Sequence, residues 1–113
     1  MHSERYHVPD DVVAACADAR RVVAVGTTSV RALESAATTG ERSGRTTILI
    51  HRPYDWKVVD LLMTNFHLPR TTLLMMIDAF IGSRWRTLYD AALLEEYRFL
   101  SFGDAMLLDR SLR

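Results

Sequence analysis

The chain has 113 residues, of which 49% are hydrophobic and 25% are charged, and its 14 basic residues balance its 14 acidic ones. This composition is that of an ordinary globular protein, and it excludes a disordered, collagen-like or coiled-coil state for the chain as a whole. We expect residues 1–113 to form one domain with no membrane partner, because the longest apolar runs are too short to span a bilayer. A lone cysteine excludes an internal disulfide.

Helices and strands are expected to alternate through the first half of the chain. A polar segment with two histidines leads to an aspartate-capped helix, after which a short apolar strand ends in glycine. Threonines and a serine then open a second helix, and a polar loop, the best candidate for disorder, separates it from a second strand. The expected helix, strand, helix, loop and strand lie at residues 10–20, 21–26, 27–39, 40–44 and 46–50.

The second half of the chain is expected to continue this alternation. After a loop and a long strand, a threonine caps a helix that is apolar nearly all round and should therefore be buried on more than one side. Gly82 is expected to end this helix, and another helix and a last strand complete the chain. The expected loop, strand, helix, helix and strand lie at residues 51–56, 57–66, 72–80, 84–97 and 104–109. The order predicts an α/β fold with mainly parallel strands and flanking helices.

A glycine that ends a strand and precedes a helix marks the first candidate binding site. The first N–H groups of a helix have no partner inside the helix, and the helix dipole adds positive partial charge there. The residues that would supply donors are Gly26, Thr27, Thr28, Ser29 and Arg31. Such a group suits a carboxylate, a phosphate or ribose hydroxyls. An ordinary strand-to-helix turn capped by a threonine is the alternative.

A polar cluster at the end of the expected strand 57–66 marks the second candidate site. Here His67 would act as a general base near neutral pH, and Asn65 would hydrogen-bond a nucleobase or a ribose. Open α/β sheets bind ligands at the carboxyl ends of parallel strands, which favours this position. A histidine with a purely structural role is the alternative.

Two further groups of candidates lie near the ends of the chain. His2 and Glu4 place an imidazole and a carboxylate two residues apart, and a frayed terminus is the alternative. Arg98 and Asp104 flank an aromatic segment that would stack on a nucleobase, and aromatic rings packed in the core are the alternative. No set of histidines and cysteines has the spacing of a zinc site, so no metal is expected.

Six segments of the chain, taken together, resemble one known family. They are MHSE at 1–4, VGTTSVRALES at 25–35, KVVD at 57–60, TNFHLP at 64–69, TLLM at 72–75, and YRF with SFGDAM within 97–106. In this order they resemble the S-adenosylmethionine:tRNA ribosyltransferase-isomerases of queuosine biosynthesis. Each segment alone is a weak signal, whereas six colinear segments that cover nearly the whole chain are specific.

The resemblance implies a cytoplasmic transferase and isomerase that needs no metal. Such an enzyme moves the ribosyl part of S-adenosylmethionine, its donor substrate, onto the 7-aminomethyl group of a 7-deazaguanine already in tRNA. The product is epoxyqueuosine-tRNA, and adenine and methionine leave. The implied fold is an α/β barrel-like catalytic domain with an inserted small β-barrel domain. This chain resembles the C-terminal portion of the catalytic domain, and the inserted β-barrel is absent from it.

The implied reaction needs a base, an acid and a held acceptor amine. The base removes a proton beside the sulfonium, and the acid assists the departure of adenine. Under the resemblance, His67 and His2 are the candidates for the base, and Glu4 and Asp104 for the acid or for orienting the amine. The candidates for binding the substrates are Gly26, Thr27, Thr28, Ser29, Arg31, Asn65, Phe66 and Arg98.

The chain departs from the family in its length and in one loop. Members of the family are substantially longer, and residues 51–56, HRPYDW, lack the Pro-Gly pair usual before the KVVD segment. We therefore expect the chain alone to be weakly active or inactive, and to need a complementing chain or to associate with itself. Two other functions stay open, namely a truncated non-catalytic remnant and a small nucleotide- or anion-binding α/β module.

Overall fold

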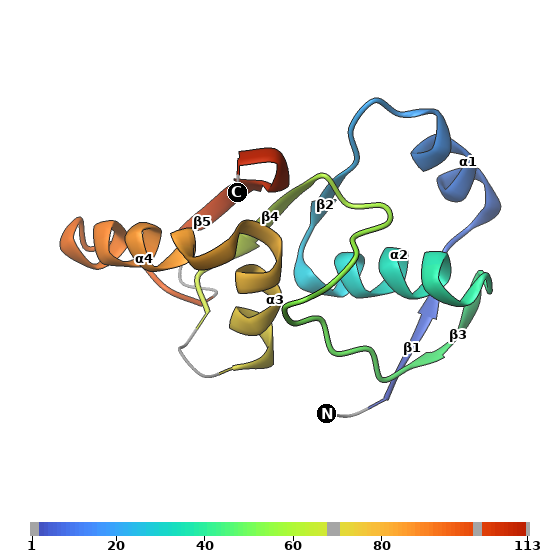
Figure 1. Cartoon of the computed structure of the whole chain (residues 1–113), viewed down its shortest axis with the longest axis horizontal. Coiled ribbons are helices and arrows are strands. Elements are labelled where there is room, and N and C mark those ends of the chain that lie inside the picture. Colours follow the sequence, from blue (N-terminus) through green and yellow to red (C-terminus); the bar gives the residue numbers. More distant parts are fainter. Residues whose placement is uncertain (1–2, 68–70, 101–102, 113) are drawn as a thin grey trace.

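The computed structural model describes residues 3–67, 71–100 and 103–112 of the chain. The strands in this part are β1 (Glu4–His7), β2 (Val23–Val25), β3 (Ser43–Thr46), β4 (Leu61–Asn65) and β5 (Ala105–Asp109). The helices are α1 (Asp10–Asp18), α2 (Thr27–Thr39), α3 (Thr72–Ile81) and α4 (Trp85–Leu94), with short 3-10 turns η1 (Gly82–Arg84) and η2 (Arg110–Leu112). Figure 1 places α1, α2, β1 and β3 in one half of the molecule and α3, α4 and β5 in the other.

The described strands form two open sheets, one mixed and one antiparallel. In the three-stranded sheet the order is β2-β4-β5, with β2 parallel to β4 and β5 antiparallel to β4, and β1 pairs with β3 in an antiparallel ribbon. The α/β class is therefore confirmed, whereas the expected mainly parallel arrangement is wrong. The parallel pair has the long crossover through α2 that parallel pairing needs, but the chain returns after α4 in the opposite direction along β4. Neither described sheet closes into a barrel.

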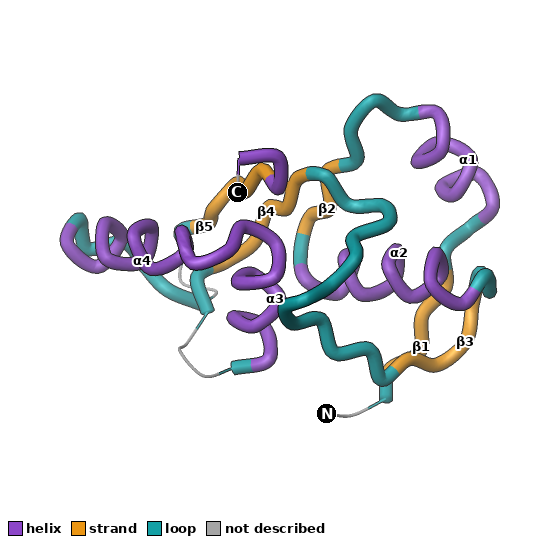
Figure 2. The backbone as a smooth tube through the Cα atoms, in the orientation of Figure 1, coloured by secondary structure: helices purple, strands orange, loops and turns teal. Residues whose placement is uncertain are grey.

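The N-terminal segment is a strand and its partner is the expected polar loop. Tyr6 is buried, and its hydroxyl group contacts the Thr39 hydroxyl at 3.0 Å and donates to the carbonyl of Glu41 at 3.1 Å. This anchor pairs β1 with residues 43–46, so Glu4 is not part of a frayed terminus, and the expectation of a disordered loop at 40–44 is wrong. The strand expected at 46–50 ends at Thr46 instead, and the chain continues as the long loop 47–60 (Figure 2).

The core lies between α3 and one face of the three-stranded sheet. Thr71 caps α3, because its side-chain oxygen accepts a hydrogen bond from the Leu74 N–H group at 3.1 Å, and the helix ends at Gly82, both as expected. Six of the ten residues of α3 are buried, which confirms that this helix is covered on more than one side. Trp56, from the long loop, packs edge-to-face on Phe80 of α3.

The helix α1 is loosely packed, in contrast with α3. No residue of α1 is buried, and Cys16 is only partly covered. A cavity of about 550 Å³ lies between α1, α2 and residues 57–60, with Val13 and Cys16 on one wall and Leu33 and Ala36 on the other. In the part of the chain that the structure describes, no helix has the length and apolar character needed to cross a membrane.

Candidate functional site

The carboxyl ends of the two parallel strands meet at one edge of the three-stranded sheet. The N–H group of Gly26, directly after β2, donates to the carbonyl of Met63 in β4 at 2.8 Å. Asn65, the last residue of β4, is paired in register with Ala105, the first residue of β5. The start of α2, residues 65–67 and the entry to β5 therefore converge on one edge, where open α/β sheets bind ligands.

Two neighbours hold His67 at this edge, one through its ring and one through its backbone. Its Nε2 lies 2.9 Å from Oγ1 of Thr64, and the backbone N–H of His67 donates to the hydroxyl oxygen of Tyr89 in α4 at 2.7 Å. Burial lowers the pKa of His67 below its ordinary value, and burial raises the pKa of Tyr89. Since the ordinary pKa of histidine is about 6.5, a lowered pKa leaves the imidazole mostly neutral at pH 7, a state in which it can accept a proton.

Asn65 and Phe66 do not share the surroundings of His67. Side chains alternate along β4, so Asn65 lies on the exposed face of the sheet while Thr64 lies on the buried face. Phe66 is 3% exposed and packs against Tyr89, Tyr97 and Phe99, with ring centroids 5.0–5.9 Å apart. Its ring is therefore part of the core, and it offers no surface to a substrate in this structure.

Arg98 and Asp104 lie on either side of the turn that leads into β5. A carboxylate oxygen of Asp104 accepts a hydrogen bond from the backbone N–H of Arg98 at 2.5 Å. The N–H of Leu100 donates to the carbonyl of Phe66 at 2.9 Å, which fixes this segment beside the end of β4. Both candidates are therefore near the edge described above, and Asp104 braces the turn there.

The start of α2 leaves its donors available. Gly26 precedes the helix with φ 89°, a conformation that glycine adopts without strain. Among the described residues no side chain caps the helix, so the expected alternative of a threonine cap is wrong. The Ser29 hydroxyl donates to the carbonyl of Val25 at 3.0 Å and is not directed at the helix N–H groups.

Arg31 and Glu4 form an ion pair beside this helix start. Arg31 is largely buried, and its Nη1 bonds the Glu4 carboxylate of β1. Its Nε and Nη2 are also buried and have no hydrogen-bond partner within the described part of the chain. A cavity of about 230 Å³ adjoins the pair and is lined also by Thr28 and Ser29. His2 lies outside the described residues.

Comparison with known proteins identifies the family. The family described as queuosine biosynthesis protein matches residues 1–108 of the chain. The chain belongs to this family. Proteins named S-adenosylmethionine:tRNA ribosyltransferase-isomerase are similar to it: that of Rubrobacter xylanophilus is 53% identical over 117 residues, and that of Thermus thermophilus is 55% identical over 118 residues. The resemblance seen in the sequence segments is thereby confirmed.

The match covers nearly all of this chain but only part of its relatives. The alignments take in 100% of the chain and 35% of the Rubrobacter protein, and 96% of the chain and 34% of the Thermus protein. The crystal structure of the S-adenosylmethionine tRNA ribosyltransferase from Thermotoga maritima has a TM-score of 0.85 and 47% identity to it, over 91% of this chain and 39% of that one. The chain spans about a third of the length of the curated relatives it matches.

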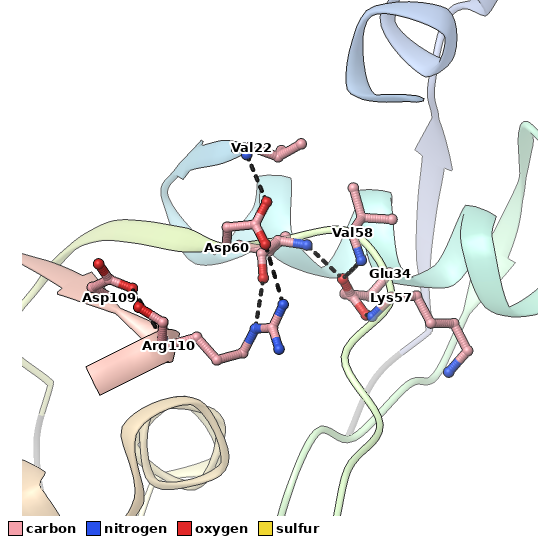
Figure 3. Close-up of polar contacts among 9 residues, drawn as sticks. Val22, Glu34, Lys57, Val58, Asp60, Asp109 and Arg110 are labelled. Atoms are coloured by element: carbon pink, nitrogen blue, oxygen red, sulfur yellow. Dashed lines mark hydrogen bonds and ion pairs between the residues drawn. The ribbon is translucent and has the colours of Figure 1, made fainter. Parts of the chain in front are cut away.

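Two of the segments shared with the queuosine biosynthesis family are joined by a buried carboxylate. Glu34 of α2 is 0% exposed, and its carboxylate accepts hydrogen bonds at 2.8–3.0 Å. The donors are the N–H groups of Lys57, Val58 and Val59 and the hydroxyl of Tyr54. Figure 3 shows Glu34 facing Lys57 and Val58 from α2. These backbone N–H groups donate to the carboxylate and not to a neighbouring strand. The strand β4 therefore begins at Leu61, and the expectation that it begins at residue 57 is wrong.

A second network closes the end of the sheet opposite the candidate site. Asp60 accepts from the N–H of Val22 at 2.8 Å and pairs with the Arg110 guanidinium (Figure 3). The Nε of Arg110 also donates to the carbonyl of Val59 at 3.0 Å. The contacts of Glu34 and of Asp60 therefore give the shared KVVD segment a structural role.

Glu34, Thr64 and Tyr89 are the residues that sequence reasoning missed. A glutamate four residues after Val30, on the apolar side of α2, was a readable sign of a buried acceptor. The approach of Tyr89 to His67 had no sign in the sequence, because the two lie 22 residues apart. No cluster of three metal-ligating side chains occurs among the described residues.

Proposed function

We propose that this chain supplies part of the catalytic centre of an S-adenosylmethionine:tRNA ribosyltransferase-isomerase. The enzyme transfers and isomerises the ribosyl group of S-adenosylmethionine onto 7-aminomethyl-7-deazaguanine in tRNA, giving epoxyqueuosine-tRNA, in the cytoplasm and without a metal. Membership of the family supports this assignment. The observation that carries it is the neutral His67 imidazole, held at the carboxyl end of β4 by Thr64 and Tyr89.

In this proposal His67 is the general base. The sulfonium charge of S-adenosylmethionine acidifies the neighbouring C–H group, and a neutral imidazole accepts the proton at pH 7. Thr64 occupies Nε2, so Nδ1, which has no hydrogen-bond partner in the described part of the chain, is the nitrogen that meets the substrate. Thr64 fixes the orientation of the ring and is a positioning residue.

The start of α2 and Arg31 bind the anionic end of the donor substrate. Arg31 has two buried donor nitrogens that no described group satisfies, and an unsatisfied charged donor is costly. The methionine carboxylate, placed in the adjoining cavity, would accept from Arg31 and from the first N–H groups of the helix. Thr28 and Ser29 line the same cavity and would contact the ribose.

The two carboxylates at the edges of the site are assigned the roles of the acid and of orienting the acceptor amine. Glu4, paired with Arg31, and Asp104, at the entry to β5, orient the amine or assist adenine departure. His2 is the second candidate for the base, and Asn65 and Arg98 contact the tRNA nucleotide. The barrel-like form of the catalytic domain arises in a longer assembly in which the remaining strands are added to these two open sheets.

A chimera tests the proposed function. The matching third of the Thermus thermophilus relative is replaced by this chain, which is 55% identical to it, and adenine release and nucleoside formation are measured with precursor tRNA and S-adenosylmethionine. We expect turnover by the chimera and little or none by the 113 residues alone. A folded chimera without turnover would overturn the assignment in favour of a non-catalytic remnant. Binding of S-adenosylmethionine without turnover would favour a binding module.

A further inference from the structure

An open groove of about 770 Å³ lies between the long loop, α3 and the start of α4, and the proposed function does not use it. Its lining combines two arginines, Arg52 and Arg86, with the side chains of Met75 and Trp85. The volume is that of a site for a small organic group. Cations beside apolar and aromatic surface suit a ligand that has both an anionic part and a flat ring.

Asp78, the acidic residue of this lining, is compensated within the chain. Both of its carboxylate oxygens accept from the Arg52 guanidinium, at 2.6 and 3.0 Å, and Oδ1 also accepts from the indole N–H of Trp85 at 2.8 Å. Arg52 belongs to the loop 51–56 that lacks the family's usual Pro-Gly pair, so the family resemblance does not account for these contacts. They fix the loop and the Trp85 ring at the groove, and no carboxylate among the described lining residues is left unpaired.

Arg86 is a cation with unused capacity for a ligand. It is exposed, and it makes no hydrogen bond or ion pair within the described part of the chain. Its guanidinium lies over the Trp85 ring, with the central carbon 5.0 Å from the ring centroid. A guanidinium stacked on an indole keeps its N–H groups available in its own plane, where they can donate in pairs to a phosphate.

The groove is connected to the candidate site through Tyr89. The Trp85 ring packs edge-to-face on the Tyr89 ring, with centroids 5.5 Å apart, and the Tyr89 hydroxyl accepts from the backbone N–H of His67 at 2.7 Å. A ligand in the groove therefore lies next to the edge at which we propose that the substrate reacts. A polymer that places one unit at His67 can place a neighbouring unit in the groove.

We propose that the groove binds a nucleotide of the substrate RNA that flanks the reacting one, with its base against Trp85 and Met75 and its phosphate on Arg86. Unpaired RNA presents bases that stack on aromatic side chains, next to phosphates that bind arginine. Met75 of α3 is 40% exposed and offers apolar surface to the base. The inference rests on the proposed function, which makes RNA the substrate, and adds where this chain holds part of that RNA.

Binding of precursor tRNA to the full 113-residue chain, without S-adenosylmethionine, tests the inference. We expect the tRNA to quench tryptophan fluorescence at Trp85, because the other tryptophan, Trp56, is buried in the core. Affinity is measured by filter binding of labelled tRNA. Arg86→Gln should weaken binding about tenfold at about 0.1 M salt and reduce the slope of log affinity against log salt concentration by about one, as loss of one phosphate contact does.

Arg20→Gln is the matched control for the charge. Arg20 is exposed after α1 and does not line the groove, so its replacement should change neither the affinity nor the salt slope. Trp85→Ala tests the stacking, and it should weaken binding about fivefold or more with the salt slope unchanged, because it removes a base contact and no charge. Folding of each variant is checked first by circular dichroism and thermal melting. If Trp85→Ala does not fold, Met75→Ala, at an exposed position of α3, carries the test with a loss of about threefold.

Equal weakening by Arg20→Gln, or full affinity of the Arg86→Gln protein, would overturn the proposal, and so would the absence of tRNA binding by both the chain and the Thermus chimera. An aspartate-rich peptide that displaces the tRNA and binds with the same dependence on Arg86 and Trp85 would overturn it in favour of an acidic protein. An inactive chimera that still binds tRNA through Arg86 would contradict the proposed function alone. An active chimera whose tRNA affinity does not depend on Arg86 would contradict this inference alone.

Discussion

The two ends of β4 are held in place by different chemistry. The chain enters the strand through residues 57–60, where the buried Glu34 carboxylate accepts from three consecutive backbone N–H groups and one hydroxyl. It leaves through residues 65–67, where Nε2 of the His67 ring contacts Thr64 and Nδ1 has no hydrogen-bond partner among the described residues. The entry is fully satisfied by the chain itself, whereas the exit retains a group that can still exchange a proton.

This difference shows that a segment can be shared within a family for a structural reason or for a chemical one. The KVVD segment supplies backbone donors to Glu34, so its role in this structure is to attach α2 to the sheet. Burial and the Glu34 carboxylate also raise the pKa of Tyr54, which stays protonated and keeps donating. The TNFHLP segment, in contrast, brings the titratable side chain of His67 to the edge of the sheet at which we propose that the substrate binds. A shared motif therefore does not by itself identify a catalytic residue.

The largest expected effect is on the entry side. Replacing Glu34 with Ala leaves four donors without their acceptor. Only the bond from Val59 is fully buried, and water can replace part of the other three, which are partly buried. A buried unpaired donor costs about 1–3 kcal/mol, so we expect the free energy of unfolding to fall by roughly 3–5 kcal/mol. Urea denaturation of the full chain measures it. Glu95→Ala, at an exposed position of the next turn after α4, is the control and should change stability by about 0.5 kcal/mol or less. If the Glu34→Ala variant were as stable as the wild type, the structural role of the entry to β4 would be contradicted.

The next effect is on the exit side and concerns turnover. In the Thermus chimera, His67→Ala should lower turnover by about two to four orders of magnitude, as expected for loss of general acid–base catalysis, with little change in melting temperature. His67→Gln should be equally damaging if the ring transfers a proton, and milder if it only hydrogen-bonds. His51→Ala, at an exposed loop position, serves as the control. A destabilised His67→Ala protein with near-normal turnover would assign the histidine a structural role.

A smaller effect is expected for the residue that orients the histidine. Thr64→Val keeps the shape of the side chain but removes the oxygen 2.9 Å from Nε2, and turnover should fall about tenfold with a shifted pH profile. Thr64→Ser restores the hydroxyl and should restore the profile. A Thr64→Val protein with the wild-type pH profile would mean that the ring is oriented by packing alone.

The smallest effect is a pH dependence of stability. Burial lowers the folded-state pKa of His67, so between that pKa and about 6.5 the unfolded chain binds a proton that the folded chain does not. The contribution to stability is fully present above about pH 6.5 and is lost as the pH falls through the folded-state pKa. The urea midpoint should therefore fall between pH 7.5 and pH 5, and less so in His67→Asn. An identical pH slope in both proteins would contradict this assignment.

Local signals in the sequence were enough for the helices near the site. Gly26 followed by hydroxyl residues predicted the start of α2, and Thr71 and Gly82 predicted both ends of α3, because capping depends on residues a few positions apart. The colinear segments likewise predicted the family, since such a resemblance requires only their order. The position of His67 just after a strand was likewise predicted from the residues next to it in the sequence.

Tertiary structure alone decided which groups meet. The pairing of β1 with β3, the acceptance of the 57–59 amides by Glu34 and the contact of Tyr89 with His67 each join residues about 20 to 40 positions apart. The direction of β5 was also decided by tertiary structure. Its antiparallel pairing with β4 depends on how α3 and α4 pack and return the chain to the sheet. Apolar periodicity states that a residue is buried, but only the folded chain determines its partner, since a buried polar group takes whichever donor or acceptor packing brings within hydrogen-bond distance.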